Sequence, residues 1–263
     1  MMTIQQIATN HNIDATKENF PVNTIRLFYL IIIYSLVTDN PQEKAEKIVK
    51  SIPLVSSILS KRTDLRLSEQ EKNIDNEWQQ NQAELDQLNQ LIPKASQSFT
   101  YLFSMLLPFQ EDLLFNIVNQ AQNEGKVFNP TDTVSTLKLR ALDSIAYSHL
   151  VCQLVNQPKH NLAIHYLTNL VYQVNDLLDS ILFAKEDTDN NNFSPFEIVR
   201  KSTKNSAEAK NLIKAILNKL TSDKTQVQLP SESQQLVDEF FDMLINILGD
   251  INPKKETETN PTE

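Results

Sequence analysis

Apolar residues recur along the chain at helical spacing, and proline and capping residues divide the pattern into segments. The strongest segment is the unbroken apolar run from Leu27 to Val37, for which we expect a helix from about Asn23 to Thr38. The run holds about 11 residues, whereas a bilayer crossing needs roughly 18 or more. This segment therefore predicts a core helix and not a membrane span.

Proline and capping signals predict where the next helices begin and end. Pro41 suits the first turn of a second helix, and Pro53 is expected to break or kink it. The stretch Ser68–Glu71 reads as a capping box that opens a long polar helix with a narrow apolar stripe. Further helices are expected from about 93 to 107, from 108 to 125 and from 194 onward. The stripe consists of Ile74, Trp78, Leu85, Leu88 and Ile92.

Two long helices, from about 132 to 156 and from 159 to 185, are predicted to meet in a tight hairpin at NQPKHN. Folding the chain about residues 158 and 159 places Lys138 level with Asp179. One consequence is that Lys138 or Arg140 pairs with an acidic residue on the second helix, a common and weak kind of interaction. A last amphipathic helix is expected to end near Gly249.

Composition narrows the fold class and the possible ligands. The chain has only two glycines, Gly125 and Gly249, which excludes glycine-rich phosphate loops and disfavours sheets with tight hairpins. We therefore predict an all-α fold, a single bundle of about 8–10 helices over residues 1–251, followed by a disordered polar tail over 252–263.

Charge and cysteine content bear on partners and compartment. The net charge of -9 disfavours nucleic acid as a partner, but Mg2+ can still bridge carboxylates to a phosphorylated small molecule. The single Cys152 lies in an apolar helical run and is expected to behave as a small hydrophobe. Without a disulfide framework the chain fits a reducing, cytoplasmic environment.

The stretch VYQVNDLLDS, residues 171–180, places three oxygen-bearing side chains in an otherwise apolar helix. Asn175, Asp176 and Asp179 fall within about one turn, and the two aspartates share a face. Such oxygen ligands suit Mg2+, whose other positions water and phosphate oxygens would fill. The alternative is a solvent-facing strip on the helix.

A second stretch, YSLVTDNPQE, presents Asp39, Asn40 and Glu43 with comparable spacing at the end of the first apolar helix. A helix cap followed by a first-turn proline explains the same residues equally simply. Both interpretations stay open on these residues alone.

Together these stretches resemble the trans-isoprenyl diphosphate synthases, all-α enzymes of the class I terpenoid synthase fold. That family carries two D-D-x-x-D motifs. The first often follows an apolar helix reading like YSLIHDD, against YSLVTDN here, and the second reads like FQ..DDILD, against YQVNDLLD here. The two motifs lie 136 residues apart, close to the family's separation, and Lys138 in STLKLRAL stands where the family has a conserved lysine.

The resemblance implies a prenyl diphosphate substrate, Mg2+ as cofactor and a central cavity within the bundle. Metals held on two facing walls would pull off the diphosphate, and the carbocation would react in an apolar tunnel. Catalysis would depend on Asp39, Glu43, Asp176 and Asp179. Metal binding would use those four with Asn40 and Asn175, and substrate binding would use Lys138, Gln173, Asn40 and Asn175.

The chain departs from that family in ways that leave three hypotheses. Asn replaces Asp once in each motif, Pro41 falls inside the first motif, and Gln173 is one residue nearer the second motif than the family's glutamine. The Arg-Arg pair and the Gly-Lys-Arg element of the second diphosphate site are absent, so the acceptor would not be isopentenyl diphosphate. The hypotheses are a divergent prenyltransferase or terpene synthase, a non-catalytic subunit in a homodimer or heterodimer, and an unrelated helical interaction protein.

Two further expectations concern residues outside these motifs. His149, His160 and His165 are too dispersed for a helical metal pattern, and His160 is expected to be a polar loop residue. The pair Phe240 and Phe241 is expected in the core or in a dimer seam.

Overall fold

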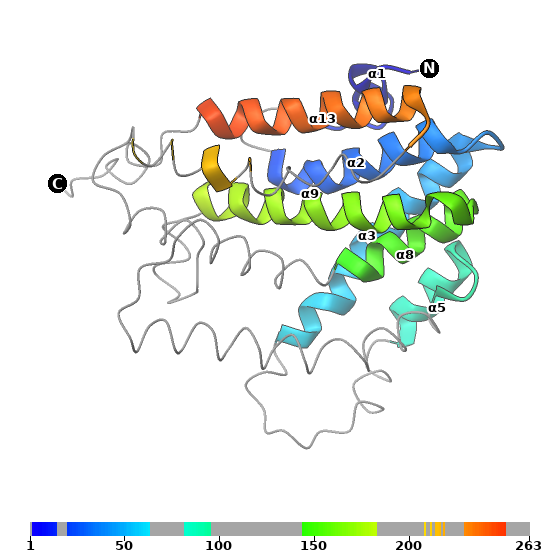
Figure 1. Cartoon of the computed structure of the whole chain (residues 1–263). Helices are drawn as coiled ribbons and strands as arrows, with labels where there is room; N and C mark the ends of the chain where they lie inside the picture. The colour runs from blue at the N-terminus through cyan, green and yellow to red at the C-terminus, as the bar shows by residue number, and fades with distance from the viewer. Residues whose placement is uncertain are drawn as a thin grey trace.

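The computed structural model describes residues 2–14, 20–63, 82–95, 144–182 and 229–250, together with 208, 211, 214–216 and 218 (Figure 1). This part of the chain is helical and contains no strand, so the all-α prediction is confirmed for it. Its elements are α1 (Ile4–Asn10), α2 (Phe20–Leu36), α3 (Pro41–Thr63), α5 (Gln82–Leu91), α8 (Ser144–Val155), the 3-10 turn η3 (Pro158–His160), α9 (Asn161–Leu182) and α13 (Ser231–Asp250).

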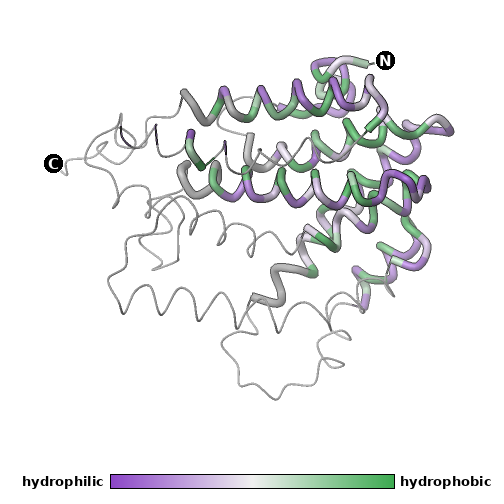
Figure 2. The backbone as a smooth tube through the Cα atoms, in the orientation of Figure 1, coloured by the Kyte–Doolittle hydropathy of each residue, from purple (hydrophilic) through white to green (hydrophobic). Residues whose placement is uncertain are grey.

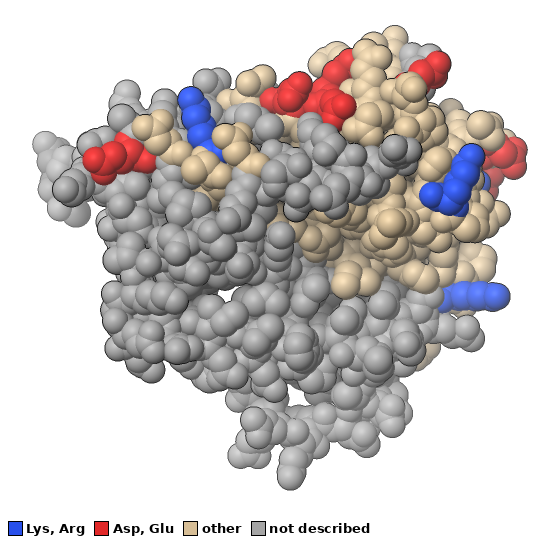
Figure 3. Space-filling view, in the orientation of Figure 1, with Lys and Arg blue, Asp and Glu red and all other residues tan. Residues whose placement is uncertain are grey.

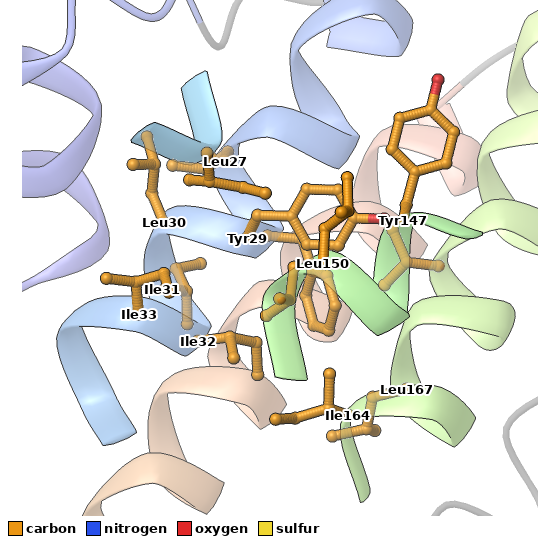
Figure 4. Close-up of a cluster of buried hydrophobic side chains, with 14 of the residues drawn as sticks. Leu27, Tyr29, Leu30, Ile31, Ile32, Ile33, Tyr147, Leu150, Ile164 and Leu167 are labelled. Atoms are coloured by element: carbon orange, nitrogen blue, oxygen red, sulfur yellow. The ribbon is translucent and has the colours of Figure 1, made fainter. Parts of the chain in front are cut away.

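Helix α2 lies at the centre of the described bundle. Each residue from Leu27 to Ile33 is at most 1% exposed, and the helix contacts α1, α3, α8, α9 and α13. A helix that is apolar on all sides must be covered on all sides. Figure 2 shows the apolar colour of this run, and Figure 4 shows its side chains near Leu150 of α8 and Ile164 of α9. The core-helix prediction is thus confirmed, and no helix in the described ranges is long and apolar enough to cross a membrane.

Two side chains fix the direction of the helices around α2. The last carbonyl groups of a helix lack partners within the helix. Here Gln157 donates its side-chain N–H to the Leu36 carbonyl oxygen at 2.5 Å, and the Ser233 hydroxyl donates to the Ser35 carbonyl oxygen at 3.1 Å. Because these donors lie at the starts of α9 and α13, both helices run antiparallel to α2 (Figure 1).

Helix α13 closes one side of the core with an aromatic pair. Phe240 and Phe241 are both fully buried, which confirms their assignment to the core. The ring of Phe240 lies 5.6 Å from that of Phe28 on α2, between centroids. The opposite face of α13 is exposed and carries Glu232, Glu239 and Asp242, and Figure 3 shows acidic side chains along this edge.

Helix α3 begins at Pro41 as predicted. It is not broken at Pro53, since it runs through this residue to Thr63, so of the two expected effects of Pro53 the break is wrong and the kink stays a prediction. An internal proline costs about 3 kcal/mol in a helix. Buried residues on both sides offset this cost, since Ile48 and Val55 are fully buried while Pro53 itself is exposed.

The expected reversal between two helices at NQPKHN is confirmed, and it is tighter than a plain loop. Asn156 adopts φ 53° after the end of α8, and Pro158 opens the 3-10 turn. His160 is only 7% exposed, so its assignment to a polar loop is wrong. The 3-10 turn directs His160 inward as it leads into α9.

Several expectations fall outside the described residues. They are the capping box at Ser68–Glu71, the helices between 96 and 143, Lys138 and Arg140, the helix start at residue 194 and the tail over 252–263.

Candidate functional site

The first acidic stretch forms an exposed turn between α2 and α3. Asp39, Asn40 and Glu43 are all exposed. Asn40 has φ 49°, a left-handed conformation that asparagine tolerates. The Glu43 carboxylate lies 2.8 Å from the Lys47 ammonium one turn later, and hydrogen bonding to Lys47 lowers the pKa of Glu43. This carboxylate is therefore engaged in a surface ion pair on its own helix.

The second acidic stretch lies near the C-terminal end of α9 and is more enclosed. Asn175 and Asp176 are half-buried. The side-chain oxygen Oδ1 of Asn175 is buried and, within the described chain, has no hydrogen-bond partner. Asp179 belongs to the same helix, although its side chain lies outside what the structure describes.

The structure does not bring the two acidic stretches together. The first stretch follows the C-terminal end of α2, and the second lies near the C-terminal end of α9. The two helices are antiparallel. The first stretch therefore lies beside the start of α9. Asn175 comes 14 residues after Asn161, which at 1.5 Å per residue is about 20 Å along the helix. Among the described residues no group of three His, Cys, Asp or Glu side chains is placed to hold a metal ion.

Helices α8 and α9 meet along polar side chains spaced four residues apart, so that each set occupies one helix face. We call this interface the polar seam. It consists of Ser144, Ser148 and Cys152 from α8, and Asn161, His165, Asn169 and Gln173 from α9.

Hydrogen bonds join the residues of the polar seam in two groups. The Ser148 hydroxyl lies 2.6 Å from Nδ1 of His165, and Asn169 donates to the Ser144 hydroxyl at 3.2 Å. Gln173 donates to the Asn169 side-chain oxygen. Gln173, predicted to bind substrate, is only 3% exposed, and its amide N–H is used in the polar seam. In the structure it therefore contributes to the interface between α8 and α9.

The polar seam is electrically neutral. Burial, followed by the nearby His149, lowers the pKa of His165. Burial raises the pKa of the Cys152 thiol to about 12. A nucleophilic cysteine needs a thiolate, so Cys152 is a packing residue, as its apolar surroundings in the sequence predicted.

A second polar group, missed in the sequence, lies between α2, α8 and α9. We call it the hydroxyl cluster, formed by Tyr29, Tyr147, Thr168 and Tyr172. The ring of Tyr147 stacks on Tyr29 at 6.2 Å and lies 5.4 Å from Tyr172, between centroids. Figure 4 shows Tyr29 extending from α2 toward Tyr147 on α8. The sequence signal was a Thr and a Tyr four residues apart on an apolar helix.

Hydrogen bonds connect the hydroxyl cluster internally and to α3. The Tyr147 hydroxyl pairs with the Ser56 hydroxyl of α3 at 3.0 Å. Tyr29 and Thr168 are both 0% exposed, and the Tyr29 hydroxyl forms side-chain hydrogen bonds with Tyr172 and Thr168. Burial raises the pKa of both Tyr29 and Tyr172 well above the usual value, so these groups act as neutral donors.

Comparison of the chain with protein-family models, with curated proteins and with solved structures gave no match.

Proposed function

We propose that the protein binds a prenyl diphosphate through Mg2+ at the end of α9 that carries Asn175, Asp176 and Asp179. The observation that carries this proposal is the enclosed position of Asn175, whose buried Oδ1 has no partner in the described chain. Carboxylate and amide oxygens suit Mg2+, which commonly completes its coordination with substrate phosphates. An unfilled buried acceptor is also what a ligand-binding position requires.

The proposal assigns the functional end of the molecule to the second acidic stretch only. Asp39 and Glu43 are exposed, and Glu43 is paired with Lys47. A metal cluster shared with α9 would need both stretches within a few ångströms, which about 20 Å along the helix does not allow. Binding of a prenyl diphosphate at the second stretch is thus better supported than its ionisation by metal ions held between both stretches. Ionisation, with transfer or cyclisation of the prenyl chain, stays a prediction of the resemblance.

A second candidate is a helical interaction protein or non-catalytic subunit. The separation of the two acidic stretches favours it, because that separation leaves no shared metal centre in the described residues. The exposed acidic face of α13, with Glu232, Glu239 and Asp242, would offer a surface for a basic partner.

Matched substitutions in the two stretches distinguish these possibilities. Calorimetry measures binding of geranyl, farnesyl and geranylgeranyl diphosphate with and without Mg2+, and a coupled assay measures diphosphate release. We expect Asn175→Ala and Asp176→Asn to weaken Mg2+-dependent binding on the order of tenfold or more, because each removes an oxygen ligand or its charge. The control substitutions Asp39→Asn and Glu43→Gln are expected to leave binding unchanged.

Each other result has a definite meaning. If both sets of substitutions weaken Mg2+-dependent binding equally and the unmodified protein releases diphosphate, both acidic stretches would have to act together in an enzyme. Absence of Mg2+-dependent binding to all three diphosphates would refute the proposal and leave the interaction protein.

A further inference from the structure

The N-terminal segment, residues 2–14, depends on α2 for its structure. Its helix α1 has 7 residues, and isolated helices shorter than about 12–15 residues are marginal in water. Its buried apolar residues are Ile7, Ala8 and Ile13, which join the core. A segment with so few buried apolar residues can open locally at a lower free-energy cost than unfolding of the whole protein.

Three hydrogen bonds hold the end of this segment on α2, and His11 makes two of them. The ring nitrogen Nε2 of His11 lies 2.9 Å from the Tyr34 hydroxyl, and Nη2 of Arg26 donates to the His11 carbonyl oxygen at 3.1 Å. The third bond runs from the side-chain N–H of Asn23 to the Asp14 carbonyl oxygen at 2.9 Å. The attachment is thus concentrated at a residue type that gains a proton near neutral pH.

The surroundings of His11 disfavour its charged form. Burial, followed by the Arg26 guanidinium, lowers the pKa of His11, while the Glu46 carboxylate on α3 acts in the opposite direction. Glu46 is exposed, so water screens its attraction. Burial and Glu46 raise the pKa of Tyr34, and its neutral hydroxyl can accept from a charged ring or donate to a neutral one. Protonation therefore acts through the added charge beside Arg26.

We propose that the N-terminal segment is a pH-sensitive element, which detaches from α2 in mild acid when His11 becomes protonated. Detachment uncovers Ile7, Ala8 and Ile13 and the part of α2 that they cover. In the detached segment His11 has its ordinary pKa of 6.5, which lies above its value in the attached segment. Below pH 6.5 protons therefore favour the detached state, by at most about tenfold per pH unit.

Amide hydrogen exchange of the full chain at pH 7.5 and 5.5 measures this detachment. The reporters are the amides of Ile7, His11 and Ile13, which donate to backbone carbonyl oxygens within the segment. After correction for intrinsic exchange rates, we expect their protection to fall about threefold to tenfold between the two pH values. NMR titration of the His11 ring should give the same midpoint as the loss of protection.

Matched variants assign the effect to His11. The amide of His11→Gln can still bond to Tyr34 but does not titrate, so protection of the segment should be the same at both pH values. The control His149→Gln removes a histidine of α8 whose pKa burial also lowers, and it should leave the fall in protection intact. Glu46→Gln removes a charge that favours protonated His11 in the attached segment. This variant should deepen the loss at pH 5.5 and have no effect at pH 7.5.

Four results would overturn the proposal. They are protection that is independent of pH, an equal fall in the His11→Gln protein, a His11 pKa at or above 6.5, and reporter amides as strongly protected as that of Leu30 on α2. The last result would mean that the segment opens only with the whole protein. If His11→Gln already loosens the segment at pH 7.5, agreement of the two midpoints in the unmodified protein decides. No Mg2+ or diphosphate is present, so these results do not depend on whether a prenyl diphosphate binds.

Discussion

We expect the protein to lose stability in mild acid, and replacing His165 by asparagine should reduce that loss. The Ser148 hydroxyl donates to the Ile145 carbonyl oxygen at 3.0 Å, so we infer that Nδ1–H of His165 donates to Ser148. The neutral ring then presents Nε2 to the Cys152 sulfur, 3.7 Å away. Protonation would point a new N–H at that weak acceptor in a buried place. The His165→Asn variant keeps a donor near Ser148 and cannot be protonated.

The sign and size of the effect follow from the lowered pKa. In the unfolded chain His165 has its ordinary pKa of 6.5, and burial lowers the pKa in the folded protein. As pH falls below 6.5 the unfolded state therefore takes up the proton first, and stability is lost. One group can contribute at most about 1.4 kcal/mol per pH unit, or about 2 kcal/mol between pH 6.5 and 5.0. Against a typical total of about 5–15 kcal/mol, this is measurable.

Urea unfolding of both proteins at pH 5.0, 6.5 and 7.5 measures the effect, and NMR titration gives the pKa of His165 directly. Burial also lowers the pKa values of His11, His149 and His160, so the variant should keep part of the dependence. Only the difference between the two slopes reports on His165. Identical slopes, or an NMR value at or above 6.5, would refute the account of the polar seam.

Other predictions test the core and the helix directions. With its pKa raised from 9.0 to about 12, Cys152 should react with iodoacetamide at pH 8 on the order of 1000-fold more slowly in folded than in unfolded protein; comparable rates would contradict its burial. Ile164→Ala should cost about 2–5 kcal/mol in urea unfolding, whereas Leu162→Ala, at a side chain 78% exposed, should change stability by about 0.5 kcal/mol or less; equal costs would mean that α9 is rotated. Gln157→Ala should cost about 1–3 kcal/mol by leaving the Leu36 carbonyl without its donor, and an unchanged melting temperature would remove one basis for the antiparallel arrangement.

Local patterns in the sequence predict the helices where burial and capping agree. The run from Leu27 to Val37 has no polar face, so a central buried helix was the simplest outcome. Pro41 and the end of α13 near Gly249 also lie where the sequence placed them. Pro53 misled because tertiary packing of α3 outweighs a local helix-breaking preference.

The position of the hairpin turn decides which residues of α8 and α9 lie opposite each other. Folding about residues 158 and 159 aligns Ser148 with Asn169, but Ser148 pairs with His165 one turn earlier. The chain reverses nearer Asn156, whose left-handed conformation ends α8. Nothing in the composition of the segment fixes this difference of about two residues.

The candidate site was less predictable than the helices, because it depends on the relative direction of two helices. Two acidic stretches at the ends of two helices meet only if the helices run the same way. Sequence spacing carries no information about direction, and α2 and α9 are antiparallel. The hydroxyl cluster was not predictable either, because its hydrogen bonds depend on which helices pack together.

The central place of α2 has a consequence for synthesis of the chain. Phe28 contacts Phe240, a residue 212 positions later. At roughly 5–20 residues per second, a ribosome takes about 10–40 s to travel that distance. Throughout that interval the most apolar of the described helices has been made, while the helix that covers one of its sides has not. Such exposed apolar surface favours aggregation, so a nascent chain stopped before residue 231 should retain a chaperone that the full chain releases.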